Sequence, residues 1–280
     1  MPTLYIVATP IGNLEDISLR ALRLLGEVDF ILCEDTRVTR ALLEHYHIKT
    51  PTISYHQHSG GGKVNEIINL LAGGKNLALV ADAGTPGISD PGGKLVQAVI
   101  EKFGVGAADE SPVRIESVPG PSAVTAALSI SGLPTDKFIF FGFPPHKKGR
   151  QTFIRKIVSS DYPAVVYESK HRIVRFLEEL DSIYKISAEE QSLDNKKISN
   201  FSAGGGSASG GQFLISKQIQ NPKFQKIKQN KNKPLTSIVV CRELSKMHET
   251  VYRGSLKSII EKIKANKNDQ KGEFTVIVGK

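Results

Sequence analysis

The stretch that decides the fold reads Ala81-Asp82-Ala83-Gly84-Thr85-Pro86-Gly87-Ile88-Ser89-Asp90-Pro91-Gly92, directly after the apolar run Leu77-Ala78-Leu79-Val80. This pattern predicts a buried strand that ends at Val80, a tight loop of small residues, and a helix that starts after Pro91. Loops just past the carboxyl ends of strands in an α/β sheet are where ligands bind. Gly84, Gly87 and Gly92 allow the backbone to approach such a ligand closely.

This loop differs from the two common phosphate-binding loops. It lacks the Gly-x-Gly-x-x-Gly pattern of dinucleotide-binding loops, and the chain has no P-loop. Gly60-Gly61-Gly62-Lys63 comes closest, but Val64 follows where a P-loop has its magnesium-binding hydroxyl. We therefore expect a nucleotide at this loop to be held by backbone groups and close packing.

Apolar runs alternate with helical patterns on both sides of the loop, over the whole first half of the chain. The expected strands cover residues 4–8, 28–33, 52–55, 76–80 and 113–118, and the expected helices 18–25, 36–46, 64–71, 92–103 and 121–130. This repetition predicts a mostly parallel sheet with helices on both faces. Gly132-Leu133-Pro134-Thr135 interrupts it, so we expect an N-terminal α/β domain over residues 1–134.

A second α/β domain is expected over residues 135–280. Its strands are predicted at 138–142, 164–168, 237–241 and 273–278, and its helices at 151–159, 173–180 and 256–265. Residues 182–235 are rich in Asn, Gln, Ser, Gly and Lys and bury too little apolar area to offset their ordering entropy. We predict that much of this segment is a disordered insertion.

Composition limits the function classes. The net charge is +9, but residues 182–235 hold nine lysines and only three acidic residues, so the basicity says little about the folded surface. No run approaches the roughly 20 apolar residues that span a bilayer, and the N-terminus lacks signal-peptide features, so we expect a cytoplasmic protein without membrane contact. Cys33 and Cys241 are expected to be buried thiols. No Cys/His spacing predicts a metal site, and His56 and His58 lack a third ligand nearby.

Polar clusters recur at the predicted strand ends. They are Thr9-Pro10-Ile11-Gly12-Asn13, Glu34-Asp35-Thr36-Arg37, the loop after Val80, Pro119-Gly120-Pro121-Ser122, and Tyr167-Glu168-Ser169 followed by Lys170-His171-Arg172. A single cluster of this kind is ordinary turn chemistry, but several that converge on one sheet edge indicate a site.

These clusters also carry a family resemblance. Residues 4–16, 34–37, 81–92, 118–123, 167–172 and 242–249 closely resemble the motifs of the bacterial ribosomal RNA small-subunit methyltransferase I family. That family belongs to the tetrapyrrole-methylase-like, class III S-adenosylmethionine enzymes. The match covers roughly residues 1–181 and 236–280, and the glycines after His58 and the long insertion depart from the family pattern.

The resemblance implies methyl transfer from S-adenosylmethionine to the ribose 2′-hydroxyl of a cytidine in 16S rRNA, cytidine 1402 in the family's usual numbering. It implies two α/β domains of the tetrapyrrole methylase type with the cofactor in the cleft between them, a homodimer, and 16S rRNA or the small ribosomal subunit as partner. The implied cofactor-binding residues are Pro10, Gly12, Ala83, Gly84, Thr85, Ile88, Ser122, Ala123, Tyr167, Leu244 and Gly272.

A ribose hydroxyl is a poor nucleophile at neutral pH, so a nearby base should help. The candidates are Asp35 and Glu168 first, with Glu34 and Asp82. Asp35 has an alternative role, because it precedes a predicted helix and suits its N-cap. Arg37 could bind an RNA phosphate bidentately.

Two basic clusters are candidates for RNA binding, although solvated helix faces give the same pattern. The candidates are Lys147, Lys148, Arg150, Lys170 and Arg172. Two other functions stay open, a tetrapyrrole C-methylase of the same fold and a non-catalytic ribosome-binding protein. The positive charge and the different first loop disfavour the former, and the intact cofactor loops disfavour the latter.

Overall fold

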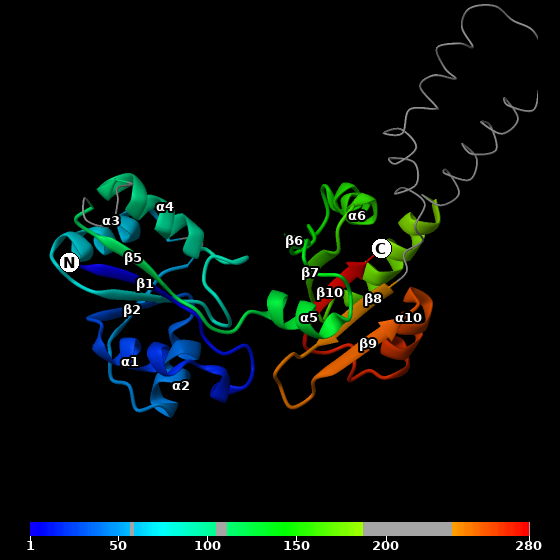
Figure 1. Ribbon diagram of the computed structural model, residues 1–280, viewed down its shortest axis with the longest axis horizontal. Coiled ribbons are helices and arrows are strands. Elements are labelled where there is room, and N and C mark those ends of the chain that lie inside the picture. Colours follow the sequence, from blue (N-terminus) through cyan, green and yellow to red (C-terminus); the bar gives the residue numbers. More distant parts are fainter. Residues whose placement is uncertain (57–58, 105–110, 187–236, 280) are drawn as a thin grey trace, which may run out of the picture. The chain divides into compact units, whose positions relative to one another are not determined.

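The computed structural model describes residues 1–56, 59–104, 111–186 and 237–279 (Figure 1). Most of the predicted insertion and His58 lie outside these residues. The chain divides into two compact units, and each is described by itself. Unit 1 comprises Met1–Ala126 and Glu243–Glu249, and unit 2 comprises Ala127–Arg242 and Thr250–Lys280.

Unit 1 contains a five-stranded sheet in the order β3-β2-β4-β1-β5, with every neighbouring pair parallel. The strands are β1 (Thr3–Val7), β2 (Phe30–Cys33), β3 (Thr52–Ser54), β4 (Leu77–Val80) and β5 (Arg114–Val118). The helices between them are α1 (Leu19–Glu27), α2 (Thr36–His45), α3 (Gly61–Ala72) and α4 (Gly92–Phe103), with a short 3-10 helix η1 (Leu14–Asp16) after β1.

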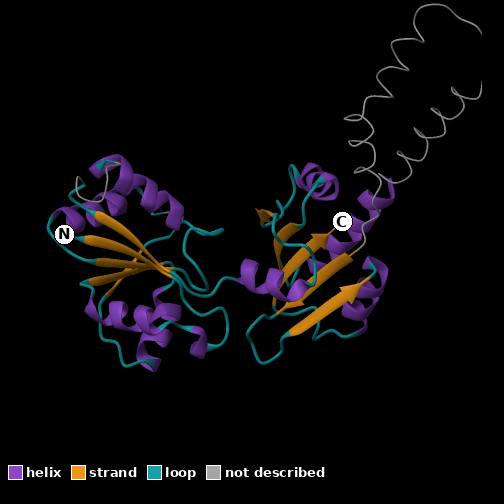
Figure 2. Ribbon diagram, in the orientation of Figure 1, coloured by secondary structure: helices purple, strands orange, loops and turns teal. Residues whose placement is uncertain are grey.

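Helices cover both faces of this sheet, as the sequence pattern predicts (Figure 2). Ala78 and Val80 of β4 pack with α1 and α2 in one apolar cluster, whereas Leu77 and Leu79 pack with α3 and α4 in another. All four β4 residues are therefore buried, which is why this strand reads as a continuous apolar run. The loop after β4 starts from a rigid, fully packed strand.

Unit 2 contains a mixed five-stranded sheet in the order β6-β7-β10-β8-β9. Its strands are β6 (Ile139–Gly142), β7 (Ala164–Ser169), β8 (Ser237–Arg242), β9 (Thr250–Gly254) and β10 (Glu273–Gly279). β6 and β7 are parallel, and the other pairs are antiparallel. β9 is an edge strand that the sequence pattern does not predict.

The described helices of unit 2 are α6 (Arg150–Ser159), a helix over residues 173–186, and α10 (Leu256–Ala265), while α5 (Ala123–Ser131) spans the division between the units. Phe176, on the helix over residues 173–186, is fully buried in the apolar core of unit 2. Cys33 and Cys241 are both buried and neither forms a disulfide, as predicted. Within the described ranges, every helix is too short or too polar to cross a membrane.

Candidate active site

Four loops of unit 1 follow strand ends and hold most of the predicted cofactor-binding residues. β2, β4, β1 and β5 are parallel neighbours in that order, so the loops that follow them lie along one edge of the sheet. These loops carry Pro10, Gly12, Ala83, Gly84, Thr85, Ile88, Ser122 and Ala123, the last at the start of α5.

Hydrogen bonds join three of these loops. The Thr9 amide donates to the Gly84 carbonyl at 3.0 Å, and the Gly84 amide donates to the Thr9 carbonyl at 3.1 Å. The buried Thr9 hydroxyl donates to the Ala81 carbonyl at 3.0 Å. The Thr85 hydroxyl donates to the Pro121 carbonyl, also at 3.0 Å. The loops after β1, β4 and β5 therefore form one connected surface.

Glycine is required where these loops approach each other. Gly84 has a φ of +82°, and a Cβ there would lie 3.3 Å from Cγ2 of Ile11. A Cβ on Gly120 would lie 3.0 Å from the Cβ of Ala8. Gly84 is predicted from the sequence to allow close approach of a ligand, and in the structure it also allows the loops to approach each other closely.

Asp90 shapes the rest of the loop after β4. Its carboxylate accepts from the Gly87 amide at 2.8 and 2.9 Å and from the Gly92 amide at 2.7 Å, the latter at the first residue of α4. Ile88 lies between Gly87 and Gly92, and 44% of its surface is exposed. The hydrogen bonds of Asp90 therefore fix a turn that exposes an apolar side chain. Asp90 is not among the residues predicted for the site, although Asp beside Pro-Gly is a recognisable signal for this turn.

Asp35 is engaged by its own helix. Its carboxylate caps α2 by accepting from the Arg37 amide at 2.9 Å and binds the Arg37 guanidinium at 2.6 and 3.0 Å. These hydrogen bonds lower the pKa of Asp35 to about 2. The helix-capping role is therefore confirmed, and a carboxylate that binds protons so weakly is a poor general base.

Glu34 has the opposite electrostatics. Glu34 is exposed, but the surrounding protein desolvates its carboxyl in part, which raises the pKa of this group, and the negative charges of Asp82 and Asp90 raise this pKa further. Asp82 also accepts a hydrogen bond from the Asp35 amide at 3.1 Å, which ties the loop after β2 to the loop after β4. The strand edge is thus acidic, and Glu34 binds a proton more strongly than an ordinary glutamate.

In the second half of the chain, two predicted cofactor residues, Leu244 and Gly272, lie in or next to turns with positive φ angles. Leu244 is buried between Glu243 and Ser245, which both have positive φ, at 52° and 61°. Such a conformation costs a non-glycine residue free energy and is enriched at functional sites, a signal that sequence reasoning cannot supply.

Gly272 has a φ of +98° and follows a turn that the buried Arg242 holds. The Arg242 guanidinium donates to the Lys271 and Asn268 carbonyls at 2.7 and 2.8 Å. Tyr167, on β7, is half-buried.

Glu168 lies in a setting that does not favour its predicted role as a base. Its side chain is fully buried and forms ion pairs with Arg172 at 2.8 Å and Arg150 at 3.5 Å. A substrate hydroxyl has no access to such a carboxylate. The RNA-binding prediction also fails for Arg150, because only 4% of its side chain is exposed.

The other predicted basic residues differ in their freedom to bind RNA. Lys147, Lys148 and Lys170 are exposed. Arg172 is only 18% exposed and is bound to Glu168. Arg37 is 87% exposed, although its guanidinium is paired with Asp35.

Comparisons with known proteins decide the family. Residues 3–199 match the model for Tetrapyrrole (Corrin/Porphyrin) Methylases. The chain is 37% identical to the Ribosomal RNA small subunit methyltransferase I of Hydrogenobaculum sp. (strain Y04AAS1), over 99% of this chain and 95% of that protein. This chain belongs to that methyltransferase family. A Synechocystis sp. (strain ATCC 27184 / PCC 6803 / Kazusa) protein of the same name is 36% identical over 99% of this chain and 79% of its own length.

Solved structures confirm the fold class. The methyltransferase CobJ aligns with a TM-score of 0.58 over 100% of this chain and 94% of its own, at 15% identity. A diphthine synthase aligns with a TM-score of 0.61 over 99% of this chain and 90% of its own, at 14% identity. At this identity the likeness shows the tetrapyrrole methylase fold alone, and the predicted family resemblance is confirmed by the closer relatives.

Proposed function

We propose that the protein transfers the methyl group of S-adenosylmethionine to the ribose 2′-hydroxyl of a cytidine in 16S rRNA, cytidine 1402 in the family's usual numbering. The names of its relatives, which call them small-subunit rRNA methyltransferases, support the substrate. The observation that carries the proposal is the connected strand edge of unit 1, where three hydrogen-bonded loops present small side chains beside acidic groups.

The residues at this edge fit S-adenosylmethionine. Gly84 has no side chain and packs close to Ile11, and the neighbouring Ala83 is small and exposed, so a ligand can lie against the backbone beside Ala83. Glu34 and Asp82 supply negative charge that favours a positively charged sulfonium. When bound, S-adenosylmethionine supplies an electrophilic methyl group.

The remaining site residues have assigned roles in this proposal. Pro10, Gly12, Thr85, Ser122 and Ala123 line the cofactor loops, and Ile88 offers an apolar surface. Tyr167, Leu244 and Gly272 are proposed cofactor contacts from the second half of the chain. The protein's main task is to hold donor and acceptor in line, because an in-line displacement depends on orientation.

Glu34 is the better candidate to accept the hydroxyl proton. It is exposed, and its raised pKa makes it a stronger base than Asp35, which is already bound to Arg37. Homodimer formation and a cytoplasmic location remain predictions, the first of which light scattering of the purified protein tests.

The decisive experiment uses tritiated S-adenosylmethionine with 16S rRNA and small ribosomal subunits from a strain that lacks the modification. We expect label on a cytidine ribose after nuclease mapping, and none with a Gly84→Val variant, whose branched side chain blocks the loop junction. A wild-type protein that binds the cofactor by calorimetry yet leaves both RNA substrates unlabelled would contradict the proposal. Label on a tetrapyrrole acceptor would favour the C-methylase alternative.

A further inference from the structure

Two turns of unit 2 follow the carboxyl ends of neighbouring parallel strands. β6 pairs in parallel with β7, with Ile139 opposite Ala164 and Gly142 opposite Val166. Residues 143–149 follow β6, and residues 170–172 follow β7. Parallel strands end at the same edge of a sheet, so these segments, called the paired turns below, lie next to each other.

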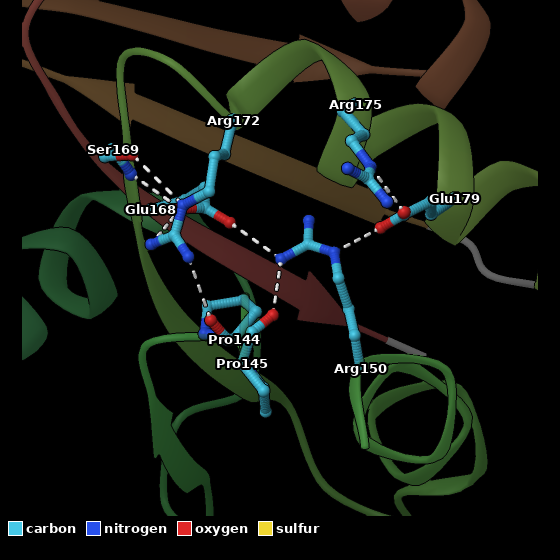
Figure 3. Close-up of polar contacts among 8 residues, drawn as sticks. All are labelled: Pro144, Pro145, Arg150, Glu168, Ser169, Arg172, Arg175 and Glu179. Carbon is cyan, nitrogen blue, oxygen red and sulfur yellow. Dashed lines mark hydrogen bonds and ion pairs between the residues drawn. The ribbon is translucent and has the colours of Figure 1, made fainter. Parts of the chain in front are cut away.

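One buried carboxylate holds both paired turns (Figure 3). Glu168 binds Arg150 through Oε2 and Arg172 through Oε1, at 3.5 and 2.8 Å. Arg150 Nη1 also donates to the Pro145 carbonyl at 3.1 Å, and Arg172 Nη1 donates to the Pro144 carbonyl at 3.2 Å. Each arginine therefore connects Glu168 to the backbone of the turn after β6.

Burial of these ion pairs costs desolvation free energy, which indicates that the network serves to position groups and not only to stabilise the fold. Arg150 is also bound by Glu179 through Nε at 2.6 Å, and Glu179 binds Arg175 at 2.8 Å, so buried and partly buried charges of both signs compensate each other. Desolvation of such ion pairs often cancels their attraction, and a well-packed apolar cluster is frequently as stable. What the charged groups provide here is a specific hold on two proline carbonyls.

The outward side chains of the paired turns combine an aromatic ring with positive charges. Phe143 is 51% exposed, and its ring centroid lies 5.4 Å from that of Tyr167. Lys147, Lys148 and Lys170 are exposed on the same two turns. Single-stranded RNA is bound by such combinations, because bases stack on aromatic rings while cations bind the phosphates.

We propose that the paired turns bind a single-stranded segment of the RNA substrate, with a base stacked on Phe143 and phosphates bound by Lys147, Lys148 and Lys170. In this arrangement Glu168 is a positioning residue, which acts through Arg150 and Arg172. The inference rests on the proposed function for the identity of the RNA, but its contacts are tested by binding alone.

The first test measures the affinity of the full chain for a fluorescein-labelled single-stranded RNA oligonucleotide across a salt series. Lys147→Ala with Lys148→Ala should reduce the slope of log affinity against log salt by about 1.4, since each lost phosphate contact accounts for about 0.7. Lys257→Ala is the control for charge. It lies on α10, which contacts β9 at the opposite edge of the sheet from β6, and should leave the slope unchanged.

Stacking is tested separately from charge. Phe143→Leu should weaken binding about tenfold and leave the salt slope as in the wild type. Phe138→Leu is the matched control, because Phe138 is also exposed, at 41%, but precedes β6 at its other end. Its affinity should equal that of the wild type.

The positioning role of Glu168 predicts a change in RNA affinity opposite in direction to the change that its charge alone would cause. Glu168→Gln removes a negative charge, so electrostatics alone would strengthen RNA binding, whereas loosened turns should weaken it about tenfold. A role only in stability would lower the melting temperature and leave the affinity measured well below it unchanged. If this variant does not fold, the exposed Phe143 and lysine variants still decide the proposal.

The outcomes separate this inference from the proposed function. Wild-type affinity and salt slope in both the Phe143 and the lysine variants would overturn the inference, even if the enzyme methylates 16S rRNA. Failure of the wild type to bind the oligonucleotide at any salt concentration would also overturn it. Loss of binding in these variants with S-adenosylmethionine affinity intact would support it, even if the methylation assay shows another RNA target.

Discussion

Substitution of Gly84 tests whether the loop after β4 is the cofactor site. At a φ of +82°, an L-residue pays about 1–2 kcal/mol of backbone strain, partly offset by the reduced freedom of the unfolded chain, so Gly84→Ala should cost about 1 kcal/mol of unfolding free energy. The new Cβ would lie 3.3 Å from Ile11 Cγ2 and 3.6 Å from the Pro121 carbonyl oxygen. The neighbouring loops must therefore shift by a few tenths of an ångström.

Gly74→Ala is a matched control. Gly74 has a φ of +87°, and a Cβ there meets no described atom within 4 Å. It follows α3 and precedes β4, so it lies at the other end of the strand from Gly84. The same backbone penalty of about 1 kcal/mol applies, and both variants should melt about 2–4 °C below the wild type.

The two variants should differ in cofactor binding. Calorimetric titration with S-adenosylmethionine should give a dissociation constant about tenfold higher for Gly84→Ala and unchanged for Gly74→Ala, a difference of about 1.4 kcal/mol. If Gly84→Ala binds the cofactor as the wild type does while it melts at the temperature of Gly74→Ala, the cofactor lies elsewhere. If both lose affinity equally, the loss reflects general destabilisation and the reasoning about the loop is refuted.

Two further predictions concern the same strand edge. Because the pKa of Glu34 is raised, its basic form is lost as the pH falls toward the usual glutamate range, so kcat/KM should fall on the acid side at a pH above 4.5. Glu34→Gln should abolish this acid-side fall of kcat/KM together with most activity. Asp35→Asn retains a capping side chain and should keep the acid-side fall, because Asp35, with a pKa of about 2, does not titrate in that range. An unchanged profile in Glu34→Gln would exclude Glu34 as the base. Thr9→Val should lower the unfolding free energy by about 1 kcal/mol in urea, since the Ala81 carbonyl loses a buried donor, and Thr9→Ser should retain most of the stability. Equal stability of Thr9→Val and the wild type, with Thr9→Ser destabilised, would show that the methyl group and not the hydroxyl matters.

Much of the fold follows from local pattern. Leu77–Val80 is apolar at every position because both faces of β4 are covered, and the predicted helix over residues 92–103 matches α4 in full. Asp35 also has a local signature, since a short acidic residue before a helix suits its cap. β9 cannot be predicted in this way, because an edge strand with one exposed face and charged neighbours carries a weak signal.

The sequence by itself determined most of the strands and helices and which loops follow the carboxyl ends of the strands, because hydrophobic period and turn residues act over a few positions. Only the tertiary structure decided which charged side chains are available. Arg150 and Lys148 are both basic and nearly adjacent in the chain, yet Arg150 is buried and Lys148 is exposed. Arg150 is buried because Glu168 and Glu179, from distant positions, supply its partners, and the cost of burying a charge depends on partners that only folding brings together.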